Sequence, residues 1–142
     1  MSRKICWITM FLLAGLVVFS ACQKQETIGI NAEMNGVPYH VVSVAELQTM
    51  LENKDFFMVN VHIPWQGDIP QTDLRLSYEE IEQNLDQLPE DRESKLLVYC
   101  LTSGMAKKAI ATLLAEGYTN LWMLDGGTTA WEEAGLSLEG KP

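Results

Sequence analysis

Basic residues are scarce in this sequence: 10 Lys and Arg stand against 19 Asp and Glu, which gives a formal net charge of −9. Two of these basic residues, Arg3 and Lys4, lie at the extreme N-terminus, and the chain without its first 21 residues would carry −11. Such a negative field repels nucleic acid and anionic lipid head groups. We therefore exclude nucleic acid as a partner, and attachment to a membrane would need a covalent lipid.

Long apolar runs are also few. The stretch from Ile5 to Phe19 carries no charge and follows directly on Arg3 and Lys4. A membrane span needs about 20 apolar residues, whereas a shorter apolar segment behind basic residues is typical of a secretion signal. We expect residues 1–21 to be a signal peptide.

The end of this segment reads Phe19-Ser20-Ala21-Cys22, which resembles the lipobox of bacterial lipoproteins with Phe in the place of the usual Leu. The resemblance implies cleavage before Cys22 and acylation of that cysteine, so that the protein would be lipid-anchored in the bacterial cell envelope, extracytoplasmic or periplasmic. A cleaved soluble form and an uncleaved anchor are the alternatives. We expect residues 22–35 to be a tether, because the first ten after Cys22 are mostly polar or small.

Cysteine is also scarce, with three residues in the chain. Of the three cysteines, Cys6 lies in the predicted signal and Cys22 in the lipid-attachment motif, so Cys100 alone remains for the folded domain. A disulfide framework within the domain is excluded, and its apolar core must hold it together. A single thiol outside the cytoplasm is either a reactive group or a buried side chain that acts as a small hydrophobe.

Residues 36–142 suffice for one domain, in which strand-like and helix-like segments alternate. Ser43 with Glu46, and Ser77 with Glu80, form the capping-box pattern that begins a helix. We expect a loop at 62–72, strands at 39–42, 56–61, 96–99 and 121–124, and helices at 43–53, 77–88, 105–116 and 128–134. This order predicts an α/β fold with a mainly parallel central sheet.

Cys100 lies between a predicted strand and a predicted helix, at the edge of the sheet where open α/β folds bind ligands. Gly104 and the small side chains of the following loop would let its backbone N–H groups point at the sulfur. Those N–H groups and the helix N-terminus favour a thiolate. We therefore expect Cys100 to be a nucleophile, unless the loop is an ordinary turn in which the thiol only packs. The predicted substrate-binding loop consists of Leu101, Thr102, Ser103, Gly104, Met105 and Ala106.

Three segments together resemble the rhodanese-like sulfurtransferases. They are Val98-Tyr99-Cys100 with its loop, residues 116–121 (EGYTNL), and Leu124-Asp125-Gly126-Gly127 with Ala130-Trp131. The resemblance implies a three-layer fold whose mainly parallel five-stranded sheet has helices on both faces. It also implies that Cys100 carries sulfur as a persulfide between a small donor, such as thiosulfate, a persulfide or a polysulfide, and a thiol acceptor.

The loop departs from the usual Cys-x-x-Gly-x-Arg-Ser pattern of that family: Ser103 stands at the Gly, Met105 at the Arg and Ala106 at the Ser. In the earlier Asp-Val-Arg pattern, Asn60 and His62 stand at the Asp and the Arg. Two guanidinium groups are therefore missing. Since the planar fork of Arg binds oxyanions in a bidentate manner, we expect poor binding of thiosulfate and a persulfide or polysulfide as the donor.

Three side chains near the loop have two interpretations each. Lys107 and Lys108 either compensate in part for the missing guanidinium groups or form a solvated helix face. His62 either hydrogen-bonds near the site or is a structural loop histidine. No second His or carboxylate is spaced to pair with His62, so we expect neither a metal site nor a cofactor.

A different functional class stays open. Loss of the loop arginine is also compatible with a catalytically weak or inactive binding module that docks a partner or senses sulfur species. A redox thiol would need a resolving cysteine, which the domain lacks, and a cysteine phosphatase would need an arginine where Met105 or Ala106 stands.

Overall fold

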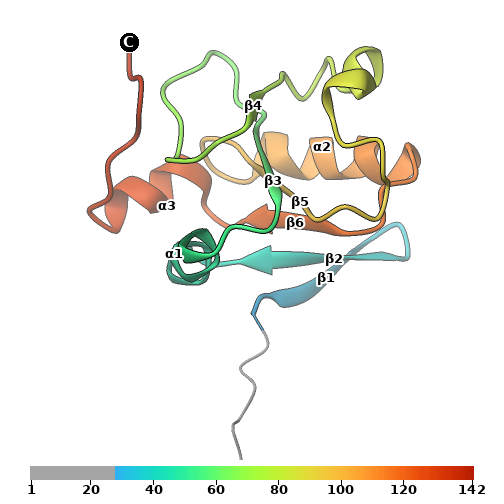
Figure 1. The fold of residues 1–142 in the computed structure, drawn as a ribbon, viewed down its shortest axis with the longest axis horizontal. Coiled ribbons are helices and arrows are strands. Elements are labelled where there is room, and N and C mark those ends of the chain that lie inside the picture. The colour runs from blue at the N-terminus through green and yellow to red at the C-terminus, as the bar shows by residue number, and fades with distance from the viewer. Residues whose placement is uncertain (1–27) are drawn as a thin grey trace, which may run out of the picture.

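A computed structural model describes residues 28–142, which form a six-stranded sheet covered by helices on both faces (Figure 1). The strand order is β1-β2-β6-β5-β3-β4, and every neighbouring pair is parallel except β1 with β2. The strands are β1 (Ile30–Met34), β2 (Val37–Val42), β3 (Phe57–Asn60), β4 (Leu74–Arg75), β5 (Leu96–Tyr99) and β6 (Leu121–Leu124). The helices are α1 (Val44–Glu52), the 3₁₀ helix η1 (Glu82–Gln87), α2 (Gly104–Ala115) and α3 (Gly127–Glu133).

The central strand β5 is buried on both faces, as a continuous apolar strand of a parallel sheet must be. Its side chains alternate: Leu96 and Val98 pack in the cluster that contains α2, whereas Leu97 and Tyr99 pack in the cluster that contains α1 and α3. The predicted α/β fold with helices on both faces is confirmed. Cys100 directly follows β5, so it lies at the carboxyl edge of the sheet.

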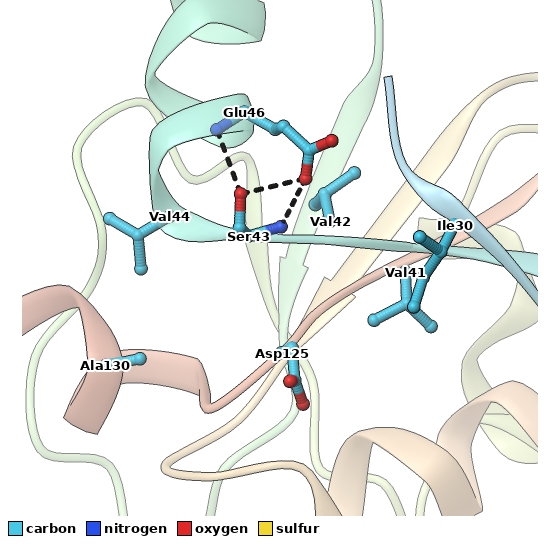
Figure 2. Close-up of a pocket in the computed structure, with 8 residues that line it drawn as sticks. All are labelled: Ile30, Val41, Val42, Ser43, Val44, Glu46, Asp125 and Ala130. Atoms are coloured by element: carbon cyan, nitrogen blue, oxygen red, sulfur yellow. Dashed lines mark hydrogen bonds between the residues drawn. The ribbon is translucent and has the colours of Figure 1, made fainter. Parts of the chain in front are cut away.

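The capping box predicted for the first helix is present. Ser43 Oγ accepts a hydrogen bond from the N–H of Glu46, and the Glu46 carboxylate accepts from the backbone N–H of Ser43 at 2.8 Å (Figure 2). These bonds satisfy two N–H groups that the helix itself leaves unpaired. The bond from the Ser43 N–H is the main reason why the pKa of Glu46 is lowered from its usual value.

The sheet has six strands rather than the expected five, and β1 lies inside the predicted tether of residues 22–35. β1 pairs antiparallel with β2 through a turn in which Asn35 and Gly36 both adopt positive φ, 53° and 80°. Such a turn matches the twist of a hairpin and favours Asn-Gly. The folded region therefore begins by Ile30, so β1 belongs to the sheet and not, as expected, to a tether.

The prediction of a helix at residues 77–88 is wrong. Leu76 donates its N–H to the carbonyl of Asn60 at 3.0 Å, and Tyr78 donates to that of Val61 at 3.3 Å. These bonds to the end of β3 keep the chain extended where Ser77 would have begun a helix. Only the short η1 forms later, and Asn84 interrupts it with non-helical φ and ψ of −131° and 32°.

Within residues 28–142 no helix is long and apolar enough to span a membrane. The predicted signal peptide, Cys22 and the first residues of the tether lie outside the described part of the chain.

Candidate active site around Cys100

Cys100 is buried, with 1% of its surface exposed, and it lines a cavity of about 320 Å³. The cavity is bounded by the end of β3, the segment before η1 and the N-terminus of α2. Its lining residues are His62, Tyr78, Cys100, Leu101, Thr102, Gly104, Met105 and Lys108. The thiol is therefore out of bulk water but beside a space that a small molecule can enter.

The loop after Cys100 presents its backbone N–H groups as donors. Ala106 N lies 3.4 Å from Cys100 Sγ and donates to it. The first helical bond of α2 is made by Lys107, whose N–H reaches the carbonyl of Ser103 at 3.0 Å. In the described chain, the N–H groups of residues 101–105 have no protein acceptor. Unpaired N–H groups at a helix N-terminus form an anion site, so this loop suits a thiolate or an anionic persulfide.

The first residues of α3 are hydrogen-bonded to the backbone of this loop. Thr128 and Thr129 donate their N–H groups to the carbonyls of Cys100 and Leu101, each at 2.9 Å. In a trans peptide the N–H points away from the C=O. The N–H groups of Leu101 and Thr102 therefore point away from α3, and both residues line the cavity.

Ser103 belongs to the loop but not to the cavity lining. Its Oγ donates to Asp125 Oδ1 at 3.1 Å and accepts the N–H of Gly126 at 3.0 Å. The side chain thus ties the loop to the β6–α3 turn. Ala106 is fully buried and contributes its backbone N–H rather than its side chain.

The two lysines of α2 differ in position. Lys108 lines the cavity, and its Nζ lies 5.1 Å from the ring centroid of Tyr78. Lys107 is exposed and does not contribute to the lining. Since adjacent helix residues point in different directions, only Lys108 adds positive charge to the cavity.

His62 follows β3 and lies half-buried in the cavity wall. Its backbone N–H donates to Asn60 Oδ1 at 3.0 Å, while both ring nitrogens are buried and have no hydrogen-bond partner within residues 28–142. Burial lowers the pKa of the ring below 6.5, because the charged form loses its hydration.

Sequence reasoning missed Tyr78, which the predicted helix would have placed differently. Its hydroxyl donates to Glu79 Oε1 at 2.8 Å, and this bond raises the pKa of the phenol above 10.0. No motif in the sequence marked this residue. It reaches the cavity because the segment before η1 is bonded to the end of β3.

A second cavity, of about 310 Å³, lies at the ends of β2 and β6 (Figure 2). Its carboxylates are already engaged: Glu46 accepts from Ser43 and from the N–H of Gly29, and Asp125 accepts from Ser103. Its lining contains no thiol, and its serine hydroxyl, Ser43 Oγ, is engaged in the capping box, where it donates to Glu46 Oε2 at 2.8 Å. The cavity that contains the thiol of the described chain is therefore the candidate active site.

No cluster of three or more His, Cys, Asp or Glu that suits a metal ion occurs in residues 28–142. Cys100 is the free cysteine of this region. The cavity around Cys100 offers one thiol, backbone donors, one imidazole, one phenol and one ammonium group.

The family model of the rhodanese-like domain matches residues 43–134, which include the whole loop and the β6–α3 turn. This chain belongs to the rhodanese-like family. The resemblance found in the sequence is confirmed for the family and the fold.

Two relatives carry names that describe an activity. The chain is 30% identical over 94 residues to a sulfurtransferase from Allochromatium vinosum, a match that covers 64% of this chain and 85% of that protein. It is 26% identical over 100 residues to the thiosulfate sulfurtransferase GlpE of Vibrio cholerae, covering 69% of this chain and 92% of the relative. These relatives support a sulfurtransferase-type role.

Solved structures agree on the fold. A rhodanese-like domain protein from Staphylococcus aureus superposes with a TM-score of 0.58 at 24% identity, over 70% of this chain and 98% of that one. A rhodanese-like domain from Anabaena gives 0.61 at 21% identity, over 69% of this chain and 76% of the other.

Proposed function

We propose that this protein is a sulfurtransferase that carries sulfane sulfur as a persulfide on Cys100. The observation that carries the proposal is the placement of Cys100 Sγ beside a cavity, 3.4 Å from the backbone N of Ala106, and followed by a loop whose other N–H groups lack acceptors within residues 28–142. Donors arranged before the reaction stabilise an anion without further reorganisation.

The transfer balances in two half-reactions. In the first, the Cys100 thiolate attacks the sulfane sulfur of a donor; a new S–S bond forms to Sγ, the donor's S–S bond breaks, and the remaining fragment leaves with that electron pair. In the second, an acceptor thiol sulfur attacks the outer sulfur of the persulfide. The bond to Sγ breaks and its electron pair returns to Cys100, so the sulfur is passed on without net oxidation.

We propose a persulfide or polysulfide as the donor in preference to thiosulfate. Met105 and Leu101 make much of the lining apolar, and Lys108 is the cation that lines the cavity. A thiosulfate dianion is bound best by a planar guanidinium fork, which this lining lacks.

The donor preference is tested by measuring the rate at which the protein acquires sulfur from inorganic polysulfide and from thiosulfate. The wild-type protein should acquire sulfur faster from polysulfide, and Met105→Arg should raise the thiosulfate rate by about tenfold through a charged hydrogen bond of roughly 1.5 kcal/mol. Met105→Leu is the matched control and should leave both rates near wild type. A wild-type preference for thiosulfate would refute this choice of donor.

We also propose that the protein is lipid-anchored through Cys22 and works outside the cytoplasm. The apolar segment behind Arg3 and Lys4 and the lipobox-like residues 19–22 support this. In bacterial cells, Cys22→Ala should shift the protein from the membrane fraction to the soluble fraction or leave it unprocessed. Cys6→Ala is the control and should not; equal membrane association and processing of all three forms would contradict the anchor.

A further inference from the structure

The imidazole of His62 is a polar group without a partner in the cavity of Cys100. Both ring nitrogens are buried, and neither makes a hydrogen bond within residues 28–142. Buried polar atoms nearly always have a partner, and exceptions gather where a ligand or a reaction completes the bonding. The cavity that His62 lines with Cys100 is the space from which such a partner would come.

The backbone of His62 is held firmly by Asn60, which is 2% exposed. Asn60 Oδ1 accepts the His62 N–H at 3.0 Å, and Asn60 Nδ2 donates to the Gly67 carbonyl at 3.1 Å and to Asp68 Oδ1 at 2.9 Å. One buried amide thus ties both ends of the segment from His62 to Gly67. Asn60 is a positioning residue, because it fixes the ring through the backbone.

The charge state of the ring follows from its surroundings. The titratable groups that share the cavity are Cys100 at the end of β5, Tyr78 before η1 and Lys108 on α2, with Glu79 bonded to the Tyr78 hydroxyl. Burial lowers the pKa of His62 below 6.5, because the charged ring loses hydration. Near pH 7 the ring is therefore neutral and has one nitrogen free to accept a proton.

We propose that His62 is the general base of the second half-reaction and takes the proton of the acceptor thiol. This role rests on the proposed function. As the acceptor S–H gives its proton to a ring nitrogen, its sulfur bonds to the outer sulfur of the persulfide, and the electron pair of the broken bond returns to Cys100 Sγ. The imidazolium then releases its proton to the outgoing persulfide or to water.

The first half-reaction does not need this base. A polysulfide fragment leaves as a stable anion, and the attacking Cys100 Sγ already accepts a hydrogen bond from the backbone N–H of Ala106, at 3.4 Å. His62 should therefore affect the discharge of the persulfide and not its formation, which separates its role from that of Cys100.

The test loads the protein with inorganic polysulfide and then mixes it with excess β-mercaptoethanol at several pH values. His62→Gln should load at the wild-type rate but discharge about 100-fold more slowly near pH 7, a typical effect of losing a general base. Discharge of the variant should rise about tenfold per pH unit as the acceptor ionises by itself, whereas the wild-type rate should be nearly flat above the pKa of His62.

Two further variants serve as a control and as a rescue experiment. His40→Gln removes the chain's other histidine, which stacks on Trp122 with 4.2 Å between ring centroids, and it should discharge like the wild type. Free imidazole added to His62→Gly should restore part of the discharge rate.

The possible outcomes distinguish the role of His62 from the proposed sulfur-carrier function of Cys100. Equal discharge by wild type and His62→Gln near pH 7, or the same steep pH profile in both, would overturn the role of His62. Failure of His62→Gln to load while the wild type loads would also overturn it, because the ring would then be needed for the cavity itself. Failure of the wild type to load at all would instead refute the sulfur carrier.

Discussion

The β5–α2 loop and the β6–α3 turn occupy equivalent places but use their backbones differently. Each joins the carboxyl end of a central strand to a helix, and β5 and β6 are neighbours in the sheet. In the β6–α3 turn, Thr128 and Thr129 donate their N–H groups to carbonyls of the other loop. In the β5–α2 loop, the Ala106 N–H donates to Cys100 Sγ, and the N–H groups of residues 101–105 have no protein acceptor in the described chain. The N-terminus of α3 therefore stabilises the neighbouring loop, whereas the N-terminus of α2 lines the cavity of Cys100.

The difference depends on glycine at the structural turn. Gly126 and Gly127 have φ of 71° and 56°, a region that side chains disfavour. A β-carbon on Gly127 would collide with the carbonyl oxygen of Cys100 and lie 2.5 Å from that of Thr102. The close approach that satisfies the loop carbonyls is therefore possible only without a side chain.

Gly127→Ala should have the largest effect on the β6–α3 turn and the loop bonded to it. The added methyl must displace the backbone of the Cys100 loop, so we expect a loss of about 3 kcal/mol or more in the free energy of unfolding, together with loss of sulfur loading. Denaturant unfolding and the loading rate measure the two effects.

Gly117→Ala is the matched control for this change. Gly117 also has a positive φ, 88°, but a β-carbon there would meet no heavy atom within 4 Å. The cost should be that of backbone conformation alone, about 1–2 kcal/mol, with loading retained. Equal losses for the two variants would show that the close contact behind Cys100 has no special importance.

A milder change, Ser103→Ala, removes the side-chain link between the two segments. The hydroxyl bonds to Asp125 and Gly126, so its loss should lower the free energy of unfolding by about 1 kcal/mol and slow loading by a few fold. Ser137→Ala, at an exposed serine, should change neither quantity measurably. If the two serine variants behave alike, the loop does not depend on this link.

The smallest expected effect separates the two lysines of α2. Lys108→Gln should slow loading from anionic polysulfide by about two- to fivefold at low salt, because Lys108 lines the cavity, and added salt should reduce the difference. Lys107→Gln, one residue away on the exposed surface, should load like the wild type. A larger effect of Lys107→Gln would mean that the donor approaches by another route.

Local patterns predicted much of this fold. The strands at 96–99 and 121–124 agree with the structure residue for residue, because each is a short apolar run, and the capping box at Ser43 correctly predicted α1. Ser77 carries the same local pattern and begins no helix, since the chain around it is bonded to the end of β3. β1 was predictable from Asn35-Gly36, a strong hairpin signal that the assignment to a tether overlooked.

The sequence predicted the position of Cys100 and its loop, but not the other residues that surround the cavity. Position after a strand and before a helix sufficed to place Cys100 and its loop at the sheet edge. Tyr78 depended on a tertiary bond that no local pattern reveals. Which of Lys107 and Lys108 lines the cavity depends on the rotation of α2, which the sequence pattern did not fix. The position of the His62 ring depends on the hydrogen bond between its backbone N–H and Asn60 Oδ1, which is a tertiary feature.

The most direct measurement is the intact mass of the protein after exposure to inorganic polysulfide and removal of the excess, followed by peptide mapping. The wild-type protein should gain about 32 Da, one sulfur atom, on the peptide that contains Cys100, and Cys100→Ala should gain nothing. An unchanged wild-type mass, or the same gain in Cys100→Ala, would contradict the claim that this cysteine carries the sulfur.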